Sequence, residues 1–189
     1  LWEIAMKLEP LPDPSAFKDN VYAHNLKGDF TGAVEVATRQ LAYLRALPHP
    51  EHDHIGAVLA QVGYAYEADL DFDRCIDTHR AVEAQWSFPI EAYRTDEKEP
   101  PSQGKLAADR IDAILGIVSC LSKRGSHADA AREGRRAREL ALSLADDEAV
   151  RPLLPVIDRM LGISLVESGE LRAGRELLEP AIRTLASNP

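Results

Sequence analysis

Residues 63–82 read GYAYEADLDFDRCIDTHRAV, and three other segments of the chain follow the same pattern. These segments are VYAHNLKGDFTGAVEVATRQ at 21–40, VSCLSKRGSHADAAREGRRA at 118–137 and GISLVESGELRAGRELLEPA at 162–181. When the four are aligned, one column contains Gly28, Leu70, Gly125 and Gly169. These positions are 42, 55 and 44 residues apart, and a period in this range indicates a stacked array of helix pairs.

Two further columns of the alignment concern the turn and the packing. Two residues after the shared turn position stand Phe30, Phe72, His127 and Leu171. Three residues later the side chains are all small, namely Ala33, Cys75, Ala130 and Gly174. Helices that pack about 8–10 Å apart need small residues where they cross. The pattern therefore predicts antiparallel helix pairs that approach closely just after each turn.

The composition favours helices and restricts the possible partners. The chain has 189 residues, 45% of them hydrophobic, and a formal net charge of −9. Apolar residues recur with helical spacing, without the strict alternation of a strand. No apolar run reaches the ~20 residues of a membrane-spanning helix, and an acidic chain is poorly suited to grip a phosphate backbone. We therefore expect an all-α protein with no direct nucleic-acid or membrane partner.

The aligned pattern resembles the tetratricopeptide repeat (TPR) family. In that family a Leu-Gly pair and an aromatic residue precede a Gly-Asp-aromatic turn, and a small residue follows in the second helix. The segments at 27–33, 59–75 and 161–174 fit this pattern well. The third segment fits least, because Val118 and His127 stand where glycine and an aromatic residue are common. The long spacing is similar to that of kinesin light chains and bacterial signalling proteins, and the resemblance covers about residues 14–189.

The resemblance implies an all-α, right-handed, TPR-like helical solenoid of about four helix pairs. The pairs are expected at about 14–47, 53–87, 105–145 and 149–187. Residues 88–104 contain three prolines and several acidic residues, which predicts an inserted loop. This loop would be either a lid over a binding groove or a tolerated insertion. Residues 1–9 are expected to be the remnant of a preceding helix in a longer protein.

The resemblance also implies a function and a binding face. TPR arrays hold peptides or helices on a concave face lined by the first helix of each pair. The expected function is a protein-interaction scaffold or regulatory module in a larger bacterial, cytoplasmic protein. The alternative is an effector-sensing domain of a bacterial transcription or signalling regulator, which an aromatic-lined pocket near Tyr22 and Tyr64 would favour. The residues expected to line the groove are Lys18, Tyr22, Asn25, Ala57, Ala60, Tyr64, Glu67, Asp112, Leu115, Ser119, Arg159 and Ile163.

Residue types that carry chemistry do not form a recognisable catalytic pattern. The sequence has no Gly-rich phosphate loop and no Gly-x-Ser-x-Gly elbow, so we expect a non-enzymatic protein without a cofactor. His49, Glu51, His52, Asp53 and His54 are possible metal ligands. They lack an established zinc spacing and lie between two expected helix pairs, so a linker is favoured over a metal site.

The cysteines and one group of arginines have structural interpretations. Cys75 and Cys120 fall on apolar faces and are expected to be buried structural thiols in a reducing compartment. Arg132, Arg135 and Arg136 share one helix face. That face is either an anion-binding patch or, as we favour, a solvated surface balanced by Asp129, Glu133 and Glu139.

Overall fold

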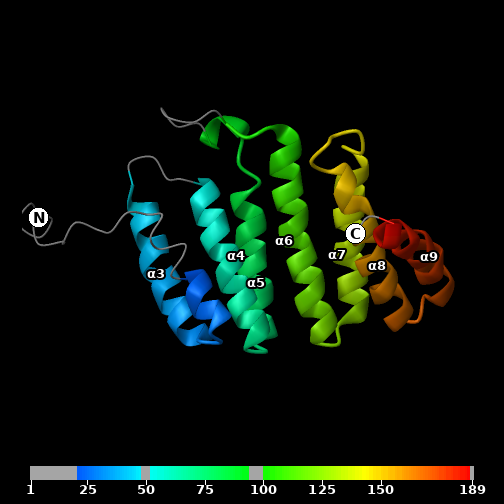
Figure 1. Cartoon of the computed structure of the whole chain (residues 1–189), viewed down its shortest axis with the longest axis horizontal. Coiled ribbons are helices and arrows are strands. Elements are labelled where there is room, and N and C mark those ends of the chain that lie inside the picture. The colour runs from blue at the N-terminus through cyan, green and yellow to red at the C-terminus, as the bar shows by residue number, and fades with distance from the viewer. Residues whose placement is uncertain (1–20, 48–51, 94–99, 188–189) are drawn as a thin grey trace, which may run out of the picture.

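The computed structural model describes residues 21–47, 52–93 and 100–187, and the structural statements below refer to these residues. Residues 21–26 are helical, and they are followed by α3 (Phe30–Ala46), α4 (His52–Ala68), α5 (Phe72–Gln85), α6 (Gln103–Lys123), α7 (His127–Leu142), α8 (Leu154–Glu167) and α9 (Leu171–Ser187). Short 3₁₀ helices cover Ile90–Tyr93 and Arg151–Leu153. The described ranges contain no strand, and the helices lie side by side in chain order along the long axis (Figure 1). The predicted all-α array of helix pairs is confirmed.

The turn inside each pair has one conformation, repeated four times. Gly28, Leu70, Gly125 and Gly169 have φ of 73°, 63°, 85° and 96°, so all four are left-handed. In the third turn the Gly125 amide donates to the Ser122 carbonyl at 3.0 Å, and the Ser126 amide donates to the Leu121 carbonyl at 2.8 Å. Equivalent pairs of bonds close the other three turns, which is the Schellman arrangement at a helix C-terminus. The alignment of the turn positions is therefore correct.

Leu70 carries a conformational cost that the other three turns avoid. In the described ranges it is the only residue other than glycine with a positive φ, and its side chain is 70% exposed. The left-handed conformation costs an L residue roughly 1–2 kcal/mol. Glycine avoids this cost but loses more backbone entropy when the chain folds, which cancels part of the gain from substituting it. We expect Leu70→Gly to raise the free energy of unfolding by up to about 1 kcal/mol, measured by urea denaturation.

Gly125→Ala is the matched control for this substitution. A Cβ at Gly125 would meet no atom within 4 Å, so its effect is purely conformational. This variant is expected to lose about 1 kcal/mol. If Leu70→Gly lowered the free energy of unfolding as Gly125→Ala does, residue 70 would not be left-handed.

Small residues lie where the helices of a pair cross. Ala33, Cys75 and Ala130 are fully buried, and Gly174 is buried in the last pair. A close approach occurs between α8 and α9, where a Cβ on Gly174 would lie 2.7 Å from the carbonyl oxygen of Gly162. The backbones therefore touch at this crossing. In the α4–α5 pair, Gly63 instead makes room for the imidazole of His79, which a Cβ would meet at 2.6 Å.

The beginning of the insertion folds back onto the second pair. The Tyr93 ring is buried and stacks on Trp86 with ring centroids 6.0 Å apart, and its hydroxyl donates to the Gln85 carbonyl at 2.6 Å. After residues 94–99, which lie outside the described ranges, Ser102 caps α6 by accepting from the Lys105 amide at 3.1 Å. The lid interpretation of this segment stays a prediction.

None of the helices in the described part of the chain combines the length and the apolar composition of a membrane-spanning segment.

Candidate functional site

The first helices of successive pairs are joined directly to one another. The Asn25 side-chain amide donates to the Gln61 carbonyl on α4 at 3.1 Å. The Ser119 hydroxyl on α6 donates to the Glu67 carboxylate on α4 at 2.5 Å. The hydroxyls of Ser122 on α6 and Ser164 on α8 are 3.4 Å apart. These contacts make one continuous wall from helix 21–26 through α4 and α6 to α8, which we call the first-helix wall.

The second helices are farther apart than the first helices. A hollow of about 300 Å³ separates α5 from α7, and Ile76, Arg80 and Asp129 are among the residues that line it. Glu83 on α5 also pairs with Arg136 on α7, so these two second helices are joined beside the hollow. The sequence analysis expected the binding groove on the first helices, and that placement stays a prediction.

Most of the residues expected in the groove lie on this wall. Tyr22, Tyr64 and Ile163 expose 54%, 51% and 42% of their surface and are therefore accessible to a partner. Asp112 and Arg159 are exposed, while Asn25, Ala57, Ala60, Glu67 and Ser119 are half-buried. Lys18 lies outside the described residues.

The expectation for Leu115 is wrong. Its side chain is 7% exposed and belongs to the core cluster that includes Ile114 and Ala137. The reason is the central place of α6, which contacts α5 and α7 on its flanks and α4 and α8 along the wall. Few of its side chains therefore remain available to a partner.

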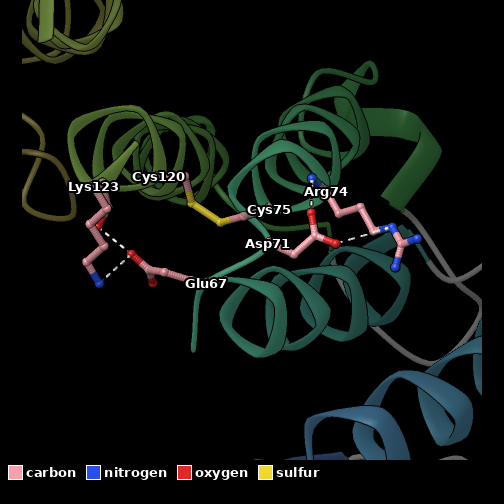
Figure 2. The surroundings of a disulfide bond; sticks show 7 residues. Glu67, Asp71, Arg74, Cys75, Cys120 and Lys123 are labelled. Atoms are coloured by element: carbon pink, nitrogen blue, oxygen red, sulfur yellow. Dashed lines mark hydrogen bonds and ion pairs between the residues drawn. A yellow bond between two sulfur atoms is a disulfide. The ribbon is translucent and has the colours of Figure 1, made fainter. Parts of the chain in front are cut away.

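The middle of the wall is acidic. Burial, with the nearby carboxylates of Asp112 and Glu67, raises the pKa of the Tyr64 phenol. Partial loss of hydration at its carboxylate and the neighbouring Asp109 raise the pKa of Asp112, while Lys105 opposes them. Lys123 holds the Glu67 carboxylate at 3.0 Å, and both residues are drawn in Figure 2. Lys105 likewise pairs with Asp109. The half-exposed Tyr64 therefore lies near two carboxylates, Asp112 and Glu67, and the ion pair with Lys123 involves Glu67.

The arginines of α7 are paired rather than free to bind an anion. Arg132 contacts Asp129 at 2.7 Å, and Arg136 contacts both Glu133 and Glu83. The Arg132–Asp129 pair fits the expected solvated surface, whereas the carboxylates that hold Arg136 are largely covered. Arg135 instead reaches Glu170 of the next pair at 2.7 Å, because stacking brings that turn against α7.

The expected linker near residue 50 is shorter than predicted. His49 and Glu51 lie outside the described residues, but α4 already begins at His52, so His52, Asp53 and His54 form its first turn. The His52 ring packs on Phe88 with centroids 4.4 Å apart, and it also contacts the Gln85 amide. Its contacts therefore tie the start of α4 to the end of α5.

The two cysteines are buried as expected, but they are joined in a disulfide, which corrects the expectation of thiols. Cys75 on α5 and Cys120 on α6 have Cα atoms 6.3 Å apart and link the second pair to the third (Figure 2). Both residues are fully buried. The sequence places each cysteine on the inner face of its own helix. It does not show that they are close to each other, because that depends on how the second pair stacks on the third.

His79, next to the disulfide, is a residue that the sequence analysis missed. It is 2% exposed, neither ring nitrogen has a hydrogen-bond partner among the described residues, and the Tyr64 ring packs edge-on at 5.8 Å. Burial lowers the pKa of His79, and Glu67 opposes this shift. The alignment contained a signal for it, because His79 is a polar residue at a position where the other three repeats have Ala37, Gly134 and Leu178.

Comparisons with known proteins give similar structures only. No family model matches the chain, and no curated protein matches it. It is similar to the crystal structure of a kinesin light chain from Podosopora anserina with nearly identical TPR-like repeats, at 14% identity over 94% of this chain and 98% of that chain, with a TM-score of 0.39. A variant of the same protein matches at 15% identity over 92% and 94% of the two chains, with a TM-score of 0.41. On its own geometry, with four matching turns, small residues at the crossings and stacked pairs, the chain is an all-α, TPR-like helical solenoid.

Proposed function

We propose that the chain is a protein-interaction module that binds a basic peptide or partner helix on the first-helix wall. The observation that carries this proposal is the placement of exposed Tyr22, Tyr64 and Ile163 on a wall whose middle is acidic. Tyrosine supplies a large contact area at low entropic cost and is enriched at the centres of interfaces. The carboxylates supply charge selection.

The acidic middle of the wall determines the chemistry of the partner. Glu67 is already held by Lys123 and Ser119, whereas Asp112 is exposed beside Tyr64. A cationic side chain of a partner that pairs with Asp112 would favour its ionised form, against the partial loss of hydration that raises its pKa. The partner therefore needs a Lys or Arg beside an apolar anchor that packs on Tyr64.

The test uses two fluorescently labelled peptides of equal length, one rich in Lys and Leu and the other rich in Glu and Leu. We expect the basic peptide to bind, the acidic peptide not to bind, and the affinity to fall as salt rises. Tyr64→Ser and Asp112→Asn are each expected to weaken binding about tenfold. Fluorescence anisotropy measures all five effects.

The matched controls are Ile182→Ser and Asp77→Asn, which change exposed residues on the second helices α9 and α5. They should leave the affinity unchanged, with folding of every variant checked by circular dichroism. Equal binding of the two peptides would contradict the proposal, and so would equal losses in wall and control variants.

A further inference from the structure

We propose that Cys75, His79 and Cys120 form a buried binding site for one zinc ion when the disulfide is reduced. This site lies under the first-helix wall and does not depend on the function proposed for that wall. It uses two helices, since Cys75 and His79 are one turn apart on α5 and Cys120 comes from α6.

The ligand atoms are already gathered. One donor atom from each of the three residues lies within 4.8 Å of the other two, and all three residues are buried. In a tetrahedral zinc site, with Zn–S near 2.3 Å and Zn–N near 2.0–2.1 Å, neighbouring ligand atoms are roughly 3.5–4 Å apart. Small side-chain movements therefore suffice once the S–S bond is broken.

His79 points to a missing ligand. It occupies a core position where the other repeats place Ala37, Gly134 and Leu178, yet it leaves both ring nitrogens without a hydrogen bond among the described residues. Buried polar groups in native proteins are normally paired, and those that are not call for a specific explanation. A metal bond to one nitrogen supplies the partner that the described protein groups do not.

Gly63 and Gly116 leave the space that the His79 ring occupies. A Cβ on Gly63 would lie 2.6 Å from Nε2, and a Cβ on Gly116 would lie 2.4 Å from Nδ1. The imidazole is therefore held between α4 and α6 by backbone that comes close to both ring edges. Such a fixed ring is suited to a ligand role, because a preorganised ligand loses little freedom on binding.

The chemistry balances with a thiol as reductant. Two thiol molecules are oxidised to one disulfide, and their two electrons and two protons convert the Cys75–Cys120 bond into two thiols. Zinc then displaces the two thiol protons, and neutral His79 donates a nitrogen lone pair. Two thiolates and one Zn²⁺ sum to zero charge, which a buried site tolerates far better than a net charge. A water or a small ligand would take the fourth position.

The test replaces zinc by Co²⁺, whose thiolate charge-transfer and tetrahedral d–d absorption bands report the ligands directly. The full chain is reduced, its two thiols are counted, and it is titrated with Co²⁺ without oxygen. We expect one Co²⁺ per reduced chain, displacement by Zn²⁺, and no bands from the oxidised chain. A reduced, folded chain that gives no tetrahedral thiolate bands would overturn the proposal.

Two histidine substitutions separate ligation from folding. His79→Leu introduces the residue found at the equivalent Leu178, so the variant is expected to fold, and it should bind Co²⁺ more than about 100-fold more weakly. His127→Leu likewise introduces the residue found at the equivalent Leu171 and should bind as the wild type does. Unchanged binding by folded His79→Leu would exclude His79 as a ligand and overturn the site.

Discussion

Reduction of the Cys75–Cys120 disulfide is expected to lower the free energy of unfolding by about 4 kcal/mol. The bond spans 45 residues and joins two consecutive helix pairs. A cross-link over a loop of this length restricts the unfolded chain, and the chain-entropy model gives the quoted value. Guanidinium unfolding with and without a thiol reductant, in the presence of a metal chelator, measures the difference.

The Cys75→Ala, Cys120→Ala double variant is the control for this experiment. It should have nearly the stability of the reduced wild type and should not respond to the reductant. The slope of the unfolding free energy against denaturant should also rise on reduction, because a chain without the cross-link exposes more surface when it unfolds. A loss below about 1 kcal/mol in the wild type would contradict the structural role assigned to the bond.

Gly162→Leu is expected to lower the free energy of unfolding by about 1–3 kcal/mol. A Cβ at this position would lie 2.7 Å from Cγ of Leu178 and 3.0 Å from the carbonyl oxygen of Gly174. The added side chain therefore forces α8 and α9 apart at their crossing. Thermal or urea unfolding measures the loss, and Ile163→Leu, at the exposed next position of α8, should change little.

Gly174→Ala tests the same contact, because the contact and helix propensity predict changes of opposite sign in the free energy of unfolding. Helix propensity alone would make alanine about 1 kcal/mol more stable than glycine. Contact with the Gly162 carbonyl oxygen at 2.7 Å and the Val166 backbone nitrogen at 3.0 Å opposes this gain. We expect the substitution to destabilise the protein, and a stabilised Gly174→Ala variant would show that the two backbones do not touch.

The local rules of the repeat were predictable from sequence. The alignment identified Leu70 as a turn residue although leucine rarely adopts a positive φ, because its neighbours Asp71, Phe72 and Cys75 follow the pattern of the other turns. It also identified the small residues at the crossings, which depend on contacts within one pair. Both features arise over a few residues, so a periodic sequence reveals them.

The contacts between pairs were not predictable in the same way. The Cys75–Cys120 bond, the Arg135–Glu170 ion pair and the burial of Leu115 all depend on how one pair stacks on the next. Residue types at one position do not fix that rotation and spacing. Of the candidate site, the exposed tyrosines followed from helical periodicity, whereas His79 was identified only once its buried surroundings were known.

We conclude that the chain repeats one kind of helix pair four times. The most direct test is the backbone conformation at the four turns, measured by NMR chemical shifts and amide–Hα couplings. We expect positive φ at Gly28, Leu70, Gly125 and Gly169, with Leu70 differing from helical leucines such as Leu121. A right-handed helical Leu70, continuous with α4 and α5, would contradict the repeat on which the account rests.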